Sequence, residues 1–185
     1  MAKTTKISIT TKTGDQGDTR LFSGEKVRKN SARLDAYGDL DELVSILSVA
    51  RHHVSHKNLK SDILLLQRQL FTVGAELATT RGKLNRLKQR VDEEMLQEME
   101  NKRMALEELV EIPRGFVIPG NTQASAYLDC ARTIARRCER KAVALFNNRD
   151  LDNKILLIWL NRLSDYLYLM ARSEEKKSLL VKERK

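Results

Sequence analysis

The sequence predicts an all-α protein, a five-helix bundle of the ferritin-like up-and-down kind with an extended N-terminal arm. Glycine (8), proline (2) and aromatic residues (5%) are scarce among the 185 residues. This composition argues against an all-β sandwich or barrel, which needs many turn and strand formers. Apolar residues recur instead every three or four positions along five segments joined by short connections. We expect one domain over residues 1–185.

Residues 1–33 show no helical period and are predicted to form the extended arm rather than a separate domain. The loop from Thr11 to Thr19 contains two glycines, but it lacks the Walker pattern and follows no apolar strand. Glycine amides can still form an anion-binding nest, with threonine hydroxyls and neighbouring cations as further donors. Taken alone, the loop is compatible both with a polyphosphate cradle and with a solvated turn.

The first two helices are predicted around 36–54 and over 59–77. The second has the clearest apolar stripe: Leu59, Ile63, Leu66, Leu70, Val73 and Leu77. In the first helix, Asp39, Asp41 and Glu42 are predicted to lie in the first turn. Acidic side chains are favourable there because of the helix dipole, and a salt bridge or a metal–water contact is the functional alternative.

The remaining helices are predicted over 92–110, from about residue 121 to 148, and from about 152 through 170. Two prolines and two glycines in 112–121 separate the third helix from the fourth. Either Asn121 or Thr122 could cap the fourth helix. We expect the charged tail, 173–185, to fray. Cys130 and Cys138 lack metal-binding spacing and are expected to be reduced core thiols.

The fourth helix has an arginine-rich face. Arg132, Arg136 and Arg140 recur at every fourth position, with Glu139 beside them. Stacked guanidinium groups repel one another unless a carboxylate or a phosphate lies between them. The face is therefore either an anion site or a solvated surface. Asn161 and Asp165, inside the apolar fifth helix, need a partner helix, an arginine or a ligand.

The charge balance favours an anionic partner. The net charge is +9, which suits nucleic acid, anionic lipid or a polyphosphate. Basic residues are spread along the chain, and a nucleic-acid-binding or scaffold protein would leave the glycine–threonine loop unexplained. A carboxylate metal bundle would need Glu-x-x-His pairs, which are missing. The apolar runs are too short to span a membrane, and no apolar signal segment begins the chain, so we expect a cytoplasmic protein.

Five sequence blocks resemble the PduO-type ATP:cob(I)alamin adenosyltransferase family. In the order of that family they are TKTGDQGDTRLFSGEKVRK (11–29), AYGDLDEL (36–43), FVIPGN (116–121), ARTIARRCER (131–140) and NRLSDYLYLMAR (161–172). Three positions depart from the family pattern. Val44 stands where asparagine is common, Asn121 where glycine is common, and Lys26 where arginine is usual.

The resemblance implies a homotrimer with each active site between adjacent subunits. The 5′-deoxyadenosyl group of ATP would pass to the cobalt(I) of cobalamin, or of another reduced corrinoid, and triphosphate would leave. Mg²⁺ is the implied cofactor, and a corrinoid reductase or an acceptor enzyme is a candidate partner. Neither nucleic acid nor a membrane is implied.

The resemblance also assigns residues to roles. In the arm it implies that ATP contacts Thr11, Lys12, Thr13, Gly14, Thr19, Arg20 and Lys29. On the helices it implies contacts with Arg136, Arg137, Glu139, Arg140 and Asn161, with Glu139 near Mg²⁺ or the ribose. Arg132 would form an intersubunit salt bridge with Asp41. Phe116 would press on the lower face of the corrin, although by itself it could equally anchor its loop in the core.

The implied chemistry agrees with the residue types. Cobalt(I) is itself a strong nucleophile, and no Ser/His/Asp or Cys/His catalytic set is visible in the sequence. The protein would need to position ATP and stabilise the charge of a leaving triphosphate.

Overall fold

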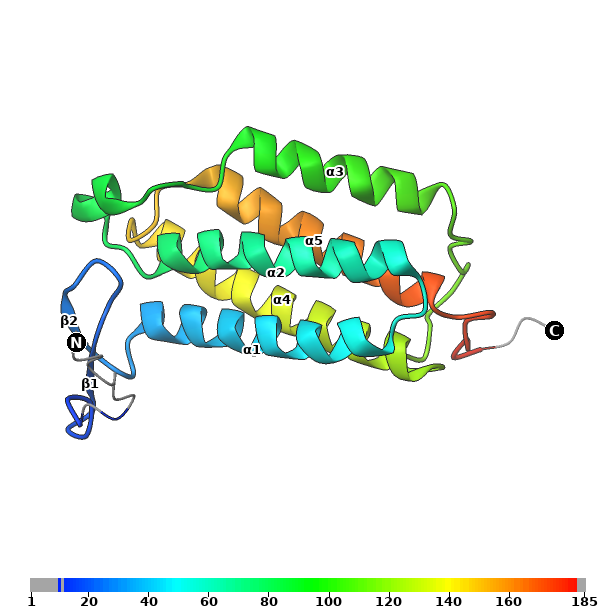
Figure 1. The fold of residues 1–185 in the computed structure, drawn as a ribbon, viewed down its shortest axis with the longest axis horizontal. Coiled ribbons are helices and arrows are strands. Elements are labelled where there is room, and N and C mark those ends of the chain that lie inside the picture. The colour runs from blue at the N-terminus through cyan, green and yellow to red at the C-terminus, as the bar shows by residue number, and fades with distance from the viewer. Residues whose placement is uncertain (1–9, 11, 183–185) are drawn as a thin grey trace, which may run out of the picture.

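The computed structural model describes residue 10 and residues 12–182. Five α-helices in this part of the chain run lengthwise in one bundle, as predicted (Figure 1). They are α1 (Ala32–His53), α2 (Lys57–Leu77), α3 (Glu93–Glu107), α4 (Gln123–Asn147) and α5 (Lys154–Ser173). A short 3-10 helix, η1 (Arg81–Arg86), lies between α2 and α3. None of the described helices is both long enough and apolar enough to cross a membrane.

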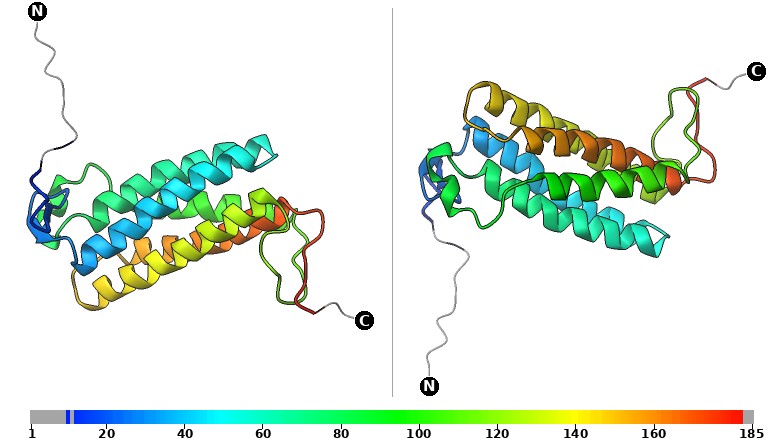
Figure 2. Two further views of the ribbon diagram at one scale, coloured as in Figure 1. Left: turned by 90° about the horizontal axis from the view of Figure 1, so that it is seen from below. Right: turned by 90° about the horizontal axis from the view of Figure 1, so that it is seen from above.

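The most extensive contacts join the helices in the order α2, α1, α4, α5, α3, and the Lys102–Asp62 ion pair also joins α3 to α2. α1 contacts both α2 and α4, and α5 contacts both α4 and α3 (Figure 2). All six apolar residues predicted for the stripe of α2 are buried. Trp159 and Tyr166 of α5 are the largest fully buried side chains. The core therefore lies along the length of the bundle and leaves the ends and the outer helix faces for function.

Two helix starts follow local capping chemistry. Thr122, rather than Asn121, caps α4: its hydroxyl accepts from the Ser125 amide while the Ser125 hydroxyl accepts from the Thr122 amide, both at 3.0 Å. Asn153 caps α5 by accepting from the first amides of that helix. Its start is therefore two residues later than the predicted 152.

The start of α1 corrects one prediction. The helix begins at Ala32, after Ser31, four residues before the predicted start, and the acid in its first turn is Asp35. Asp39, Asp41 and Glu42 therefore lie beyond the first turn, and the prediction that places them there is wrong. Favourable interaction with the helix dipole fades within one turn and does not explain these carboxylates.

The two ends of the bundle carry different structures (Figure 1). At one end the arm folds into an antiparallel hairpin of β1 (Asp18–Arg20) and β2 (Lys26–Arg28). At the other end the tail is ordered beyond α5, because Val117 and Leu180 form an antiparallel bridge. The expectation that the tail frays is therefore wrong for this segment, whose amides and carbonyls pair with the 116–118 loop.

The two thiols of α4 differ. Cys138 is buried, as predicted, and burial together with the nearby Asp39 carboxylate raises its pKa to about 12. Cys130 is exposed, so the prediction that it is a core thiol is wrong. Both cysteines are free, as expected.

Candidate active site

The loop of the arm folds back on itself. Its turn uses positive φ at Lys12 (57°) and Gly17 (83°), and the Gly17 amide donates to the Gly14 carbonyl at 3.2 Å. The Lys29 amide closes the loop by donating to the Gly17 carbonyl at 2.9 Å. A Cβ at Gly14 would lie 3.0 Å from the Lys29 ammonium, so glycine lets this cation lie directly against the loop. Thr13 is exposed, and Thr11 lies outside the described residues.

Charged side chains of the two hairpin strands, β1 and β2, form ion pairs with one another. Asp18 accepts from Lys26 at 2.8 Å and lies 3.3 Å from Arg28. The hydrogen bond from Lys26, followed by the charges of Arg28 and Lys26, lowers the pKa of Asp18 despite partial desolvation. Lys26, which departs from the family pattern, thus makes a strand-to-strand ion pair. Thr19 is half-buried, and the guanidinium of Arg20 donates to the Gly24 carbonyl at 3.0 Å.

The turn of the hairpin is fastened to the segment around η1. Thr80 Oγ1 donates to Glu25 at 2.6 Å, Lys83 lies 3.1 Å from the same carboxylate, and Arg86 donates to the carbonyl of fully buried Ser23 at 2.7 Å. We call these five residues the hairpin latch. Hydrogen bonds from Ser23 and Thr80 lower the pKa of Glu25 to about 2. Sequence reasoning missed the latch because its partners are more than 50 residues apart.

The segment that carries the latch is itself anchored in the bundle. Fully buried Glu76, near the end of α2, accepts from the guanidinium of Arg90 at 2.7 and 2.8 Å and from the Val91 amide at 3.0 Å. Asn153 also donates to Glu76, at 2.9 Å. A buried carboxylate with this many donors is well satisfied, so the latch rests on a fixed support.

The arginine face of α4 borders a groove of about 320 Å³ between α3, α4 and α5. Arg132 and Arg136 line it together with Ser164, Asp165 and Tyr168. Arg132 pairs with Asp129 of its own helix at 3.0 Å. Arg136 and Arg140 are exposed, and neither makes an ion pair with a described residue. The arginine-rich face is therefore real, and two of its cations are available to an anion.

Arg137 is engaged within its own chain. Its guanidinium lies 3.1 Å from buried Asp39 and also pairs with Glu42, while Lys141 lies 2.9 Å from the second oxygen of Asp39. Desolvation alone would lower the pKa of Arg137, but the hydrogen bond and charge of Asp39, with those of Glu42, raise it. The salt-bridge alternative for the acids of α1 is confirmed for Asp39 and Glu42.

Polar residues of α5 find partners on neighbouring helices. Asn161 donates to Glu139 of α4 at 3.0 Å. Arg162 pairs with Glu100 of α3 at 2.6 Å and with Asp165 at 3.3 Å, which confirms the expected arginine partner of Asp165. No group of three or more His, Cys, Asp or Glu side chains in the described part of the chain could hold a metal.

Phe116 points into solvent rather than into the core. It is 86% exposed, so the alternative that it anchors its loop in the core is wrong. The tail holds this loop: the Val181 amide donates to the Phe116 carbonyl at 2.9 Å, and the Ile118 amide to the Leu179 carbonyl at 2.7 Å. Asn121 donates to the Lys177 carbonyl at 2.7 Å, so this departure from the family pattern adds a tether.

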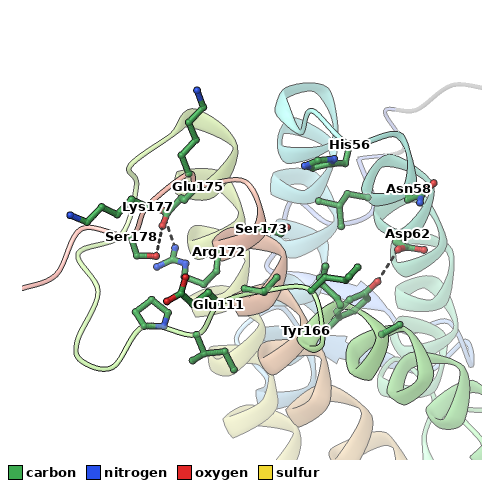
Figure 3. Close-up of a pocket in the computed structure, with 18 of the residues that line it drawn as sticks. His56, Asn58, Asp62, Glu111, Tyr166, Arg172, Ser173, Glu175, Lys177 and Ser178 are labelled. Carbon is green, nitrogen blue, oxygen red and sulfur yellow. Dashed lines mark hydrogen bonds and ion pairs between the residues drawn. The ribbon is translucent and has the colours of Figure 1, made fainter.

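A larger cavity, of about 1550 Å³, lies between α2, α3, α5 and the tail (Figure 3). Tyr166 borders it and donates to Asp62 at 2.9 Å. Burial, and then the charge of Asp62, raise the pKa of this phenol. Arg172 lies against Glu175 and Asp129 at 3.3 and 2.5 Å. None of the predicted site residues lines this cavity.

The residues predicted to bind ATP lie in two separate groups, one in the arm and one on the helices α4 and α5. The arm lies at one end of the bundle (Figure 1). Arg136 lies midway along α4, by the bounds of that helix. No hydrogen bond or ion pair among residues 12–182 joins the arm to Arg132, Arg136 or Arg140. Asp41 is exposed, and it has no ionic partner within the same range. At the third departure, the apolar Val44 side chain is partly buried against the core, and its backbone carbonyl accepts from Gln67 of α2 at 3.0 Å.

The sequence and the fold both match known adenosyltransferases. The family model described as cobalamin adenosyltransferase matches residues 9–174. A corrinoid adenosyltransferase of Citrobacter freundii is 42% identical over 174 residues, which cover 90% of this chain and 94% of that protein. PduO of Salmonella typhimurium is 36% identical, and the match covers 91% of this chain and half of that longer protein.

A solved structure gives the same fold. It is a variant PduO-type ATP:corrinoid adenosyltransferase from Lactobacillus reuteri, complexed with cobalamin and ATP. The TM-score is 0.84 at 32% identity, covering 95% of this chain and all of that one. The chain therefore belongs to the PduO-type corrinoid adenosyltransferase family.

Proposed function

We propose that this chain works as a homotrimer in which the arm of one subunit and the arginine face of its neighbour bind one ATP. The observation that carries the proposal is the separation of these two groups within a single chain. Each offers donors suited to phosphate: Lys12 and Lys29 at the loop, Arg136 and Arg140 on α4. A second subunit is the simplest way to bring both groups to one nucleotide.

The reaction transfers the 5′-deoxyadenosyl group of ATP to the cobalt(I) of cobalamin. The cobalt electron pair attacks the C5′ carbon, the C5′–O bond breaks, and triphosphate leaves with the bonding electrons. No proton needs to be removed from the nucleophile. The residues therefore act by positioning and by charge: cations on both sides of the phosphates stabilise the charge that develops on the leaving oxygen.

Mg²⁺ fits the acidic residue on the arginine face. This ion usually binds through one or two carboxylates together with substrate phosphates, and it keeps several waters. Glu139 is a single half-buried carboxylate oriented by Asn161, so it would hold Mg²⁺ only together with the phosphates. Bound there, the ion would neutralise part of the triphosphate charge.

Exposed Phe116 supports a role against the lower corrin face. An apolar ring there would keep the nucleotide base of cobalamin away from cobalt and so favour reduction of the metal. The exposed carboxylate of Asp41 supports the proposed intersubunit salt bridge with Arg132, because nothing in the described part of its own chain pairs with it. Both residues contribute to the site without forming a bond to substrate.

Mixed trimers test the shared site. Lys29→Glu, with a damaged arm, and Arg136→Ala, with a damaged helix face, should each be inactive as purified trimers. Random mixing by co-expression should restore about one quarter of wild-type activity, because one site in four pairs an intact arm with an intact neighbouring face. A site within one chain would instead leave every mixed trimer inactive.

The reaction itself is tested by anaerobic incubation of the wild-type protein with MgATP and chemically reduced cobalamin. We expect the absorption spectrum of a cobalt–carbon bond to appear, with one triphosphate released per corrinoid. Release of orthophosphate or pyrophosphate in place of triphosphate would contradict the proposed bond cleavage. Absence of any corrinoid product would overturn the function.

A further inference from the structure

We propose that the cavity of about 1550 Å³ beside the tail receives the nucleotide arm of cobalamin, its benzimidazole base and sugar phosphodiester, once that base has left cobalt. This inference rests on the proposed function and adds a second subsite to it. A base that is kept off cobalt remains covalently attached to the corrin ring. Its apolar ring and its charged phosphate then need either solvent or a place on the protein.

The cavity adjoins the arginine groove. Ile112 lines both hollows, so one side chain forms part of the wall between them. Phe116 follows Ile112 by four residues in the same loop. The backbone of the tail, which borders the cavity, is hydrogen-bonded to the loop around Phe116. A corrin ring lying against Phe116 would therefore have this cavity within reach of its flexible arm.

The walls suit an aromatic base. Apolar side chains from α2, α3, the following loop and the tail face the cavity: Leu59, Leu106, Leu109, Val110, Ile112 and Leu180. Leu109 is 82% exposed and Ile112 is 47% exposed, so much apolar surface would be covered by an occupant. The volume exceeds that of most small-molecule pockets, which leaves room for base, sugar and phosphate together.

The charges suit a phosphodiester. The cationic lining residues other than histidine are Lys102, Arg114, Arg172, Lys176 and Lys177, against the three carboxylates Asp62, Glu111 and Glu175. Asp62 pairs with Lys102 at 2.6 Å, and Glu175 pairs with Arg172 at 3.3 Å. Arg114, Lys176 and Lys177 form no ion pair with residues 12–182. The cavity therefore carries excess positive charge for one phosphate.

The backbone of the tail cations is held in place. The Lys177 carbonyl accepts from Asn121 at 2.7 Å, and Ser178 donates to Glu175 at 2.9 Å (Figure 3). Residues 176 and 177 thus lie on a segment fixed at both sides rather than on a free end. Anchoring this backbone reduces the conformational freedom that the tail would lose on binding an anion, while the two lysine side chains themselves are exposed.

The test compares cobalamin with cobinamide, a corrinoid that lacks the nucleotide arm. Ala105→Trp would place an indole inside the cavity and occupy part of it, and Met104→Trp would place the same side chain outside the cavity on the same helix. Lys176→Ala/Lys177→Ala would remove two cations. Lys88→Ala/Lys154→Ala removes the same charge from exposed positions at the opposite end of the bundle. We would measure the KM and the equilibrium dissociation constant of each variant for each corrinoid, with the wild-type protein as reference.

We expect both cavity variants to weaken cobalamin binding about fivefold or more while leaving cobinamide binding unchanged, and both controls to behave as wild type. Equal losses with the two corrinoids would overturn the proposal, because the cavity would then be contacting the ring. Unchanged binding of cobalamin in both cavity variants would overturn it as well. If wild-type protein adenosylates neither corrinoid, the proposed function fails, and this inference fails with it.

Discussion

Asn161 on α5 donates a hydrogen bond of 3.0 Å to Oε1 of Glu139 on α4. The amide oxygen of Asn161 accepts from Arg162, also at 3.0 Å, so the orientation of the amide is fixed from both sides. Oε2 of Glu139 accepts no hydrogen bond from residues 12–182 and remains available to a ligand. One helix therefore orients the single carboxylate of the arginine face on the other helix.

Asn161→Ala should raise KM for MgATP about tenfold, because Glu139 loses the donor that orients it. Glu139→Gln keeps an acceptor for Asn161 but removes the charge, so it should mainly raise the Mg²⁺ concentration needed for half-maximal rate. Steady-state kinetics at varied ATP and Mg²⁺ separate the two effects. Asn147→Ala, at an exposed position on α4, is the control. An unchanged KM in Asn161→Ala would show that this hydrogen bond has no part in ATP binding.

Arg136→Ala should lower kcat/KM for ATP by about 10²–10³-fold, the usual effect of removing one donor to a developing negative charge. Melting temperature should not change, because Arg136 is exposed and forms no ion pair with a described residue. Activity assays and thermal denaturation on the same samples test both statements. Arg68→Ala removes an exposed arginine from α2 and should be fully active. Near-wild-type turnover of Arg136→Ala would exclude this residue from the site.

The sequence predicts what local periodicity and capping determine. The stripe of α2 and the position of the α4 cap follow from neighbouring residues; the structure confirms the stripe and selects Thr122 from the two candidate caps, Asn121 and Thr122. The predicted start of α1 is four residues late because the first turn precedes the regular apolar pattern, and Ser31 before it makes no side-chain capping hydrogen bond. The partner of Asp39 is about a hundred positions away on α4, and single-sequence spacing gives no information about such pairs.

In the candidate site, too, features within one helix could be predicted from the sequence, and contacts between distant segments could not. The arginine face could be predicted from spacing alone because it belongs to one helix. The hairpin latch could not, because residues 79–111 contain no recognisable motif and acquire their role only by contact with the arm. The resemblance names the loop residues of the arm, and the tertiary contacts explain what holds that loop in place.

Weakening the hairpin latch should raise the KM for ATP but not the KM for the corrinoid. Thr80→Val removes the hydroxyl that donates to Glu25 while keeping the side-chain volume, and Arg86→Ala removes the donor to Ser23. Each should raise KM for ATP about fivefold, since one hydrogen bond contributes roughly 1 kcal/mol. KM for the corrinoid should stay constant. Asn85→Ala, exposed on η1, is the matched control. Equal changes in both KM values would point to general destabilisation instead.

Low pH should weaken the contribution of Glu25 to the stability of the folded protein. Hydrogen bonds from Ser23 and Thr80 lower its pKa from 4.5 to about 2 in the folded protein. A lowered pKa stabilises the fold above the unfolded value, and this stabilisation is lost as the pH falls toward the folded value. The melting-temperature difference between wild type and Glu25→Gln should therefore be full above about pH 5 and shrink toward pH 3. Glu108→Gln, an exposed carboxylate outside the latch, gives the baseline. A constant difference across this range would contradict the prediction.

Phe116→Ala should slow the reaction from cobalt(II)alamin far more than the reaction from chemically prereduced cobalt(I)alamin. Without the ring, the nucleotide base can return to cobalt(II), and a metal that keeps this ligand is harder to reduce. Cobalt(I) holds no lower ligand, so the second reaction should lose little. Because Phe116 is 86% exposed, melting temperature should not fall. Ile118→Ala, in the same loop and 42% exposed, separates this effect from a general loss of apolar surface. Equal slowing from both cobalt states would mean that Phe116 places the corrin rather than excluding its base.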